Sequence, residues 1–409
     1  MAGWSLYLVT AYVLVDYIVR KTAPLAAFSG IWDELLLIGV VLLGLWQAGV
    51  ERWRLHGTRL LLPVLAYSAV MLGLLLLNSP EMEVAVEGLR VMVQYVLWFF
   101  VGANLVRSKP QLRWLTDAFL LVAVGLAAHG VYQYVVGVEI PLTWIDSKVE
   151  TSIRTRVFSI IGSPNVLGSL LVLALPVGFV GYLQARAPLK KLVYAAACGV
   201  MAACLVFTFS RGAWLALAVV LLLLGLWRDR RILAAILLLA LLTPVLLPSV
   251  YHRVAYMATP EYTKSSIRGG RLGRWDQALN YWRGAPATGV GLGRFGGAVA
   301  AQHFPYDSFY VDNFYLKVGV ETGWVGLSAL LVLLLCGLHL ARRSLDEVDD
   351  DELRTLGLGI LAGLVGVLAH NAVENIFEVP MMATYFWFFL GAVVATPWMG
   401  TGGGEVAHD

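Results

Sequence analysis

Three arginines spaced three residues apart stand among glycines in the segment RGGRLGR, residues 268–274. A guanidinium group grips phosphate oxygens through its planar fork of donors. Glycines let the backbone approach a ligand closely and present N–H groups to an anion. Arg268, Arg271 and Arg274 therefore indicate a site for a phosphorylated ligand, although a solvated basic turn would have the same composition.

A further arginine lies in the segment TFSRGAW, between two apolar runs that are joined with almost no loop. Arg211 is the only charged residue between Lys191 and Arg228. An arginine in the middle of a membrane costs about 2.5–3.5 kcal/mol on insertion scales, so one at the end of a span needs water or a partner. We expect Arg211 either to extend its head group to the membrane surface or to bind phosphate.

The segment RTRVFSIIGSPN, residues 154–165, precedes another apolar run. Pro164 and Asn165 indicate the start of a helix, and Gly162 permits a tight approach of the backbone. This segment makes Arg156 a further candidate for binding the phosphate group.

Several side chains could take a proton from a hydroxyl group. Asp312 lies where the chain returns to an apolar run, and it is a candidate for a helix cap or for a catalytic base. His370 and Glu374 are spaced one helical turn apart in another apolar run, where ionisable groups favour function, although a structural hydrogen-bonded pair explains them equally well. His303 is an alternative base without supporting spacing.

The segment GVGLGRFG, residues 289–296, contains the GxGxxG pattern of dinucleotide-binding sites. That function requires a preceding strand and a βαβ unit, whereas this segment lies in a polar loop between apolar runs. We therefore expect its glycines to form tight turns.

These residues belong to a chain with the composition of a membrane protein. Of 409 residues, 59% are hydrophobic and 14% are charged, whereas a soluble domain carries about 25% charged residues. Apolar runs of about 17–25 residues recur, the length that crosses about 30 Å of hydrocarbon as a helix. The sequence predicts an all-α polytopic transmembrane bundle of about twelve spans. The predicted spans lie near residues 3–19, 31–50, 59–78, 90–106, 114–137, 160–184, 191–208, 212–228, 231–248, 313–341, 355–378 and 381–398.

The stretch between the ninth and tenth spans, residues 249–312, is too polar to lie in a bilayer. It holds seven lysines and arginines against four acids, so its net charge equals the +3 of the whole chain. A local basic excess favours an anionic ligand over nucleic acid. We predict spans 1–9 in residues 1–248, a catalytic loop in 249–312, spans 10–12 in 313–398 and a disordered tail in 399–409.

Basic residues in the short loops predict the orientation. The loops after spans 2, 4, 6, 8 and 10 carry three each: Arg52, Arg54, Arg59; Arg107, Lys109, Arg113; Arg186, Lys190, Lys191; Arg228, Arg230, Arg231; and Arg342, Arg343, Arg354. Because such loops stay in the cytoplasm, we expect both termini inside and residues 249–312 on the extracytoplasmic side. Arg20 and Lys21 disagree with this orientation, because they follow the predicted first span and would lie outside. The acidic run 346–352 would then be a solvated cytoplasmic turn.

The three cysteines, Cys198, Cys204 and Cys336, all lie in apolar runs. The chain has no CxxC pair and no paired histidines beside them, so we expect neither a disulfide nor a zinc site. No metal ion is predicted.

Taken together, RVFSIIGSPNVLG, FTFSRGAWLAL, R…RW…AL…APATGVGLGRFG and DNFYLKVGVETGWVG resemble the O-antigen ligase/polymerase family. These segments cover about residues 154–325. The resemblance implies a metal-independent inverting glycosyltransferase of the bacterial inner membrane that needs no cofactor. Such enzymes pass a glycan from undecaprenyl pyrophosphate to a growing polysaccharide, to lipid A–core or to another cell-envelope acceptor on the extracytoplasmic side.

By this resemblance, Arg211 matches the essential arginine of the SRG-type segment. Arg274, or its neighbours Arg268 and Arg271, matches the loop arginine, and both arginines would bind the pyrophosphate. At the position of Asp312 the lipid A–core ligases carry a histidine that is proposed as the base, so this chain departs from the pattern there and both ligase and polymerase remain open. An ionised carboxylate could take the proton, and preorganised arginines could stabilise the leaving group.

A transporter of polysaccharide or lipid-linked glycan is the alternative function. Transporters often show paired halves with broken helices at the middle of the membrane. Here the polar groups cluster at one face, which favours an enzyme. A membrane protein whose loop binds a partner is a second alternative.

Overall fold

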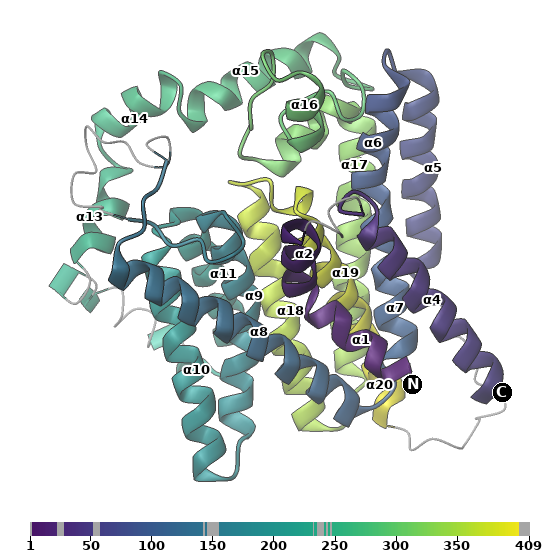
Figure 1. The fold of residues 1–409 in the computed structure, drawn as a ribbon, viewed down its shortest axis with the longest axis vertical. Coiled ribbons are helices and arrows are strands. Elements are labelled where there is room, and N and C mark those ends of the chain that lie inside the picture. Colours follow the sequence, from purple (N-terminus) through teal and green to yellow (C-terminus); the bar gives the residue numbers. More distant parts are fainter. Residues whose placement is uncertain are drawn as a thin grey trace.

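The computed structural model describes residues 2–22, 28–51, 58–141, 144, 155–231, 233–234, 241–242, 244–245 and 248–400. In these residues the regular secondary structure is all helical, with no strand (Figure 1). The elements are α1 (Ala2–Thr10), α2 (Tyr12–Lys21), α4 (Trp32–Glu51), α5 (Leu61–Leu77), α6 (Met82–Val93), η1 (Gln94–Val96), α7 (Leu97–Leu105), α8 (Lys109–Val136), α9 (Pro164–Gln184), α10 (Pro188–Phe207), α11 (Arg211–Trp227), α13 (Pro248–Tyr256), α14 (Pro260–Ile267), α15 (Arg271–Gly284), α16 (Ala298–His303), α17 (Phe314–Asp346), α18 (Asp351–Asn371), η3 (Ile376–Glu378), α19 (Pro380–Val394) and α20 (Thr396–Gly400).

Among the described residues, seven helical segments are long and apolar enough to cross a membrane. They are Trp32–Val50, Met82–Leu105, Lys109–Val136, Pro164–Gln184, Pro188–Phe207, Phe314–Asp346 and Asp351–Asn371. Three shorter apolar helices, α5, α11 and α19, accompany them. The all-helical membrane class is confirmed, while the count of twelve spans stays a prediction. Most of the predicted ninth span and the tail beyond Gly400 lie outside the described residues.

The predicted first span, residues 3–19, is interrupted between α1 and α2. The Tyr385 hydroxyl of α19 donates a hydrogen bond to the Thr10 carbonyl at 2.9 Å. The Leu14 amide, which would bond to that carbonyl in a continuous helix, donates to the Ala11 carbonyl instead. The prediction of one continuous helix was therefore wrong here. The Thr10 carbonyl bonds to a residue of a distant helix and not to the amide four residues later in its own helix.

The long helix α17 contains a break at Gly323. Its φ of 63° and ψ of −165° lie in a region that glycine adopts readily. The amides of Trp324 and Val325 donate to the carbonyls of Pro286 and Ala287. A Cβ atom at Gly323 would lie 2.1 Å from the Ala287 carbonyl oxygen. The break therefore fastens the segment before α16 to the side of α17.

The glycines of residues 289–296 form the tight turns expected of them. Gly289, Gly291, Gly293 and Gly296 all have positive φ. A Cβ atom at Gly293 would lie 2.5 Å from the carbonyl oxygen of Val84 in α6. These glycines serve close packing of the backbone against α6 and α17.

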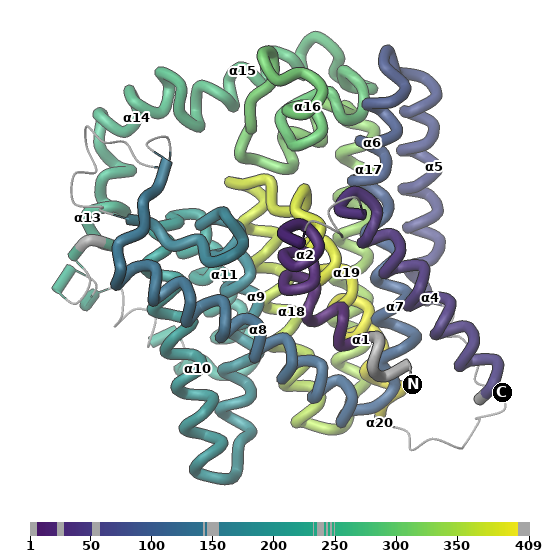
Figure 2. Tube along the Cα trace, viewed as in Figure 1, coloured from purple at the N-terminus to yellow at the C-terminus, as the bar shows by residue number. Residues whose placement is uncertain are grey.

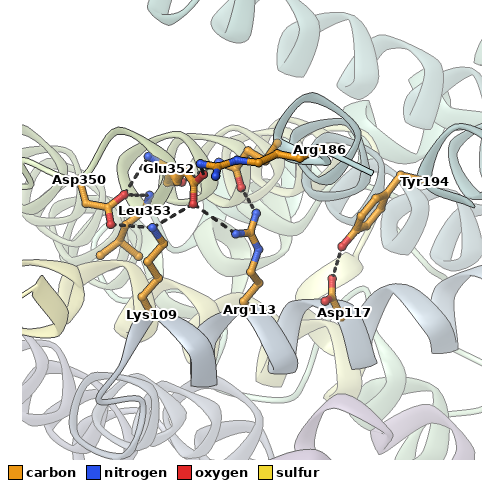
Figure 3. Close-up of polar contacts among 9 residues, drawn as sticks. Lys109, Arg113, Asp117, Arg186, Tyr194, Asp350, Glu352 and Leu353 are labelled. Carbon is orange, nitrogen blue, oxygen red and sulfur yellow. Dashed lines mark hydrogen bonds and ion pairs between the residues drawn. The ribbon is translucent and has the colours of Figure 1, made fainter. Parts of the chain in front are cut away.

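The acidic run before α18 binds the basic ends of other helices. Lys109 of α8 forms ion pairs with Asp350 at 2.6 Å and with Glu352 at 3.0 Å. Glu352 also pairs with Arg113 and Arg186, as Figure 3 shows. The hydrogen bond from Lys109 lowers the pKa of Asp350 below its ordinary value. The expectation of a plain solvated turn was wrong, because this run ties α8 and the end of α9 to the start of α18.

A further ion pair brings in the loop after the predicted eighth span. Arg228 contacts Asp351 at 3.0 Å. The loops after predicted spans 4, 6, 8 and 10 therefore meet at one end of the bundle, as the distribution of basic residues requires. Which side of the membrane this end faces stays a prediction.

Cysteine labelling tests that orientation in a variant lacking the native cysteines. Ser265 of α14 is exposed, and so is Asp349 of the acidic run at the other end. We expect Ser265→Cys to react with an impermeant thiol reagent in intact cells, because the basic loops keep the opposite end in the cytoplasm. Asp349→Cys, the matched control, should react only after lysis. The reverse pattern would overturn the orientation.

Candidate active site

The segment 249–312 folds into four of the described helices, α13 to α16. Figure 1 shows α14, α15 and α16 across the top of the view, and Figure 2 shows the same course along the Cα trace. Helix α15 packs on α17. On its inner face Ala278 is fully buried, and a Cβ atom at Gly319 of α17 would lie 2.6 Å from the Trp282 ring. Leu279 of the same helix is 40% exposed.

Asp312 lies between the start of α15 and the start of α17. Its Oδ2 atom is 2.7 Å from Arg274 Nη2 and 3.7 Å from Arg271 Nε, and 16% of its side chain is exposed. Its φ of 51° is left-handed, which is uncommon outside glycine and often accompanies function. The cap of α17 is Asn313, whose side chain accepts the Leu316 amide at 3.0 Å. The interpretation of Asp312 as a helix cap is therefore wrong.

The start of α15 is held firmly against this segment. Arg274 Nη1 donates to the Tyr310 carbonyl at 2.8 Å, and the Trp275 indole donates to the Val311 carbonyl at 3.0 Å. Arg274 thus uses one guanidinium nitrogen for the backbone and another for Asp312. These two contacts orient its guanidinium fork.

The three loop arginines do not have equivalent positions. Arg271 is the first residue of α15 and faces Asp312 together with Arg274. Arg268 caps the end of α14 and is exposed. Gly269, with a φ of 131°, turns the chain between the two helices. The structure brings Arg271 and Arg274 together and leaves Arg268 apart from their ion pairs.

Arg211 is the first residue of α11 and reaches toward the large polar segment. Its guanidinium carbon lies 5.1 Å from the ring centroid of Tyr262 in α14, a cation–π geometry. The neighbouring Gly212 has His370 of α18 against it, because a Cβ atom there would lie 2.9 Å from His370 Nε2. Arg211 therefore stands at a junction of α11, α14 and α18.

Arg156 is buried and joins two of the motif segments. Its Nε donates to the Thr208 carbonyl at 2.9 Å, its Nη1 to the Trp144 carbonyl at 2.8 Å, and its Nη2 to the side-chain oxygen of Asn165 at 3.2 Å. The Asn165 amide in turn donates to the Glu374 carboxylate. In this structure Arg156 positions Asn165, and its contact with pyrophosphate stays a prediction.

Glu374 lies beyond the end of α18, not one turn further along it. The helix ends at Asn371, whose side-chain oxygen accepts the Phe377 amide at 3.1 Å and turns the chain. The prediction that His370 and Glu374 share a helix face was therefore wrong. His370 stays inside the helix, and Glu374 lies in the turn that follows.

The turn after α18 runs beside Asp312. The Asn313 amide donates to the Asn375 side-chain oxygen at 3.0 Å, and the Phe314 amide donates to the Glu374 carbonyl at 3.3 Å. Burial and the nearby Asp312 carboxylate raise the pKa of Glu374 to about 7, and the Arg271 guanidinium opposes this shift. A second carboxyl group therefore belongs to the site.

Residues 196–331 match a family model described as O-Antigen ligase. This match supports the assignment of the chain to the O-antigen ligase family. The matched segment includes Arg211, the helices α13 to α16 and Asp312, whereas Asn165 and Glu374 lie outside it. A search of curated proteins gave no match.

The match to this family model indicates a glycosyltransferase-like enzyme. Together with the membrane-spanning helices, it fits a bacterial inner-membrane protein that handles glycan and lipid substrates. The family resemblance seen in the sequence is therefore confirmed at this level. The roles of individual residues remain proposals.

The two histidines suggested as alternative bases occupy different settings. His370 is 1% exposed, and its Nδ1 has no hydrogen-bond partner among the described residues. His303 ends α16 and contacts Glu87 of α6 at 3.1 Å, a contact that involves neither Asp312 nor the arginines of α15.

Arg253 of α13 was not singled out in the sequence. It is 7% exposed, and its Nε donates to the Phe209 carbonyl at 2.9 Å. This bond supports the turn that leads into the SRG segment, where Phe209 has a left-handed φ of 50°. In the sequence, the position of Arg253 at the start of the polar segment 249–312 was the only indication of this role.

A buried ion-pair triad underlies the site. Lys317 Nζ lies 2.7 Å from Glu321 and 3.1 Å from Glu378, with each side chain at most 4% exposed. The two carboxylates also accept the backbone amides of Phe295 and Ala298. The triad fixes the glycine-rich segment and the turn after α18 to α17. The sequence pattern that could have predicted part of this triad is the spacing of Lys317 and Glu321 by four residues in an apolar run.

Proposed function

We propose that this protein transfers a glycan from undecaprenyl pyrophosphate to a hydroxyl group of a cell-envelope acceptor. The acceptor is a growing polysaccharide, lipid A–core or another envelope glycan or lipid. The transfer takes place on the extracytoplasmic side of the inner membrane, inverts the anomeric centre and needs no metal ion. The observation that carries the proposal is the convergence of Arg271 and Arg274 on Asp312.

Two helix N-termini support pyrophosphate binding at this place. Arg211 is the first residue of α11 and Arg271 is the first residue of α15. The first amides of a helix lack partners within it and favour an anion, as does the helix dipole. A pyrophosphate group at these ends would meet both backbone donors and guanidinium forks.

The ion pairs of Asp312 suggest how donor binding prepares the chemistry. A lipid pyrophosphate carries more negative charge than one carboxylate, so it competes with Asp312 for Arg271 and Arg274. Once those arginines turn to the phosphates, Asp312 becomes free to accept a proton. The base would then be available only when donor is bound.

The reaction follows as one displacement. The acceptor oxygen attacks the anomeric carbon from the face opposite the pyrophosphate and gives its proton to Asp312. The bond from the anomeric carbon to the phosphate oxygen breaks, and undecaprenyl pyrophosphate leaves with the electron pair. The arginines stabilise the charge that develops on this leaving group.

Reconstitution tests the function directly. We expect purified protein in liposomes to form a new glycosidic bond between a lipid-linked donor and an acceptor without any ion gradient. Donor without acceptor is the control, and mass spectrometry of the product measures the transfer. Movement of the intact lipid-linked glycan across the bilayer without bond formation would favour the transporter instead.

A further inference from the structure

We propose that Asp312 and Glu374 act as a pair in which Glu374 holds the proton that Asp312 takes from the acceptor hydroxyl. The inference rests on the proposed glycan transfer to a hydroxyl group. It adds a second carboxyl group, from outside the segment that matches the family model, to the chemistry of the site.

The backbone brings these two carboxyl groups together from separate elements. Asp312 precedes α17, and Glu374 follows α18. The bond from the Asn313 amide to Asn375 spans the two segments at the residues next to both carboxyl groups. The bond from the Phe314 amide to the Glu374 carbonyl is the second link. These two hydrogen bonds therefore hold the segments that carry the two carboxyl groups side by side.

The surroundings of the two carboxyl groups differ in charge. Asp312 lies against the guanidinium groups of Arg271 and Arg274. The hydrogen-bond donors to the Glu374 carboxylate are neutral, namely the Asn165 side-chain amide and the Asn375 backbone amide. Cations favour an ionised carboxylate more strongly than neutral donors do. A shared proton therefore resides on Glu374.

Asn165 is oriented for this contact. Arg156 Nη2 donates to its side-chain oxygen at 3.2 Å, and because only that oxygen can accept, the NH₂ group is directed to Glu374. Arg156 is itself fixed by two backbone carbonyls. Arg156 and Asn165 are thus positioning residues for Glu374.

The charged and titratable groups around Glu374 come from each neighbouring element. The charges of Asp312, before α17, and of Arg271, in α15, act on it, and His370 lies near the end of α18. Burial and Asp312 raise the pKa of Glu374 to about 7, while Arg271 lowers it. When a lipid pyrophosphate draws Arg271 away, the carboxyl pair binds a proton more tightly. Donor binding thus makes the carboxyl pair more basic at the step in which the hydroxyl group of the acceptor substrate loses its proton.

The proton balance is complete without any further reactant. The proton passes from the acceptor oxygen to Asp312 and then to Glu374, as the glycosidic bond forms and the pyrophosphate leaves with its electron pair. Glu374 then releases the proton to water. Glu374 must therefore be ionised at the start of each turnover, and the rate should rise with pH through about 7.

The substitution Glu374→Gln tests the pair, because glutamine keeps an oxygen that accepts the Asn165 bond. We expect kcat/KM to fall by a factor on the order of ten or more. The wild-type rise of kcat/KM with pH through about 7 should disappear in the variant. Asp307→Asn, at an exposed position of the polar segment 249–312, is the control and should keep the wild-type rate and pH profile.

Thermal unfolding gives a readout that does not depend on activity. A carboxyl group whose pKa rises from 4.5 to about 7 on folding adds stability below pH 4.5, and this stability is lost as the pH rises through 7. The Glu374→Gln variant should therefore melt above wild type at pH 8 and close to it at pH 4.5.

The outcomes separate the inference from the function on which it rests. If wild type transfers glycan and Glu374→Gln keeps both its rate and its pH profile, Glu374 is a structural hydrogen-bond acceptor and the inference fails alone. If wild type transfers no glycan, the proposed function and the proton pathway both fail, even where the melting difference shows that Glu374 binds a proton.

Discussion

The substitution Arg274→Lys is expected to remove most of the turnover while the protein still folds. Arg274 uses Nη1 for the Tyr310 carbonyl and Nη2 for Asp312, and a lysine ammonium is a point charge that cannot reproduce this planar fork. Arg211→Lys should have the same effect at the start of α11. We expect each variant to lose on the order of 100-fold in kcat/KM with lipid-linked donor.

The control for these variants lies on the same helix. Arg283 is exposed near the end of α15 and bonds to Asn280 at 2.6 Å, so Arg283→Lys should keep the wild-type rate. Arg271→Lys should also lose turnover because Arg271 faces Asp312, whereas Arg268→Lys should lose little. Turnover near wild type in both Arg274→Lys and Arg211→Lys would reduce these residues to surface or snorkelling cations.

The substitution Asp312→Asn should lower turnover strongly and leave donor binding largely intact. Asparagine keeps the size of the side chain and tolerates the left-handed φ of 51°, so the backbone should not change. What it loses is the ability to accept a proton, which is worth on the order of 100-fold in rate. Single-turnover rates and equilibrium binding of the lipid-linked donor separate these two effects.

Asp276→Asn is the matched control for this variant, because Asp276 is an exposed acid of α15. It should leave the rate unchanged. An active Asp312→Asn variant beside an inactive His370→Ala or His303→Ala variant would place the base elsewhere. The helix cap offers no alternative explanation, because Asn313 fills that position.

The helical class of this protein followed from local sequence. Apolar runs long enough to cross a membrane must satisfy their backbone groups internally, and a helix does so within one segment. In the structure Ser163 precedes α9 and Ser210 precedes α11, and their hydroxyl groups accept amides of the first turn. The break in α1–α2 escaped prediction, because it depends on the hydroxyl of Tyr385.

The arginines were recognisable by residue type, but their arrangement was not. Arg268, Arg271 and Arg274 are equally spaced in the sequence and look equivalent there. The turn at Gly269 assigns Arg268 to the end of α14 and the other two to the start of α15. Only the packing of α15 on α17 then brings those two to Asp312.

Glu374 shows most clearly what tertiary structure alone decided. Its spacing from His370 pointed to a shared helix face, but the helix ends at Asn371. Its hydrogen-bond donor, Asn165, lies 209 residues away in the chain, and the Asp312 carboxylate that raises its pKa precedes another helix. Periodicity in a sequence indicates which residues share one face of a helix. A contact between separate helices depends on how those helices pack, and the spacing of the residues in the sequence does not indicate that packing.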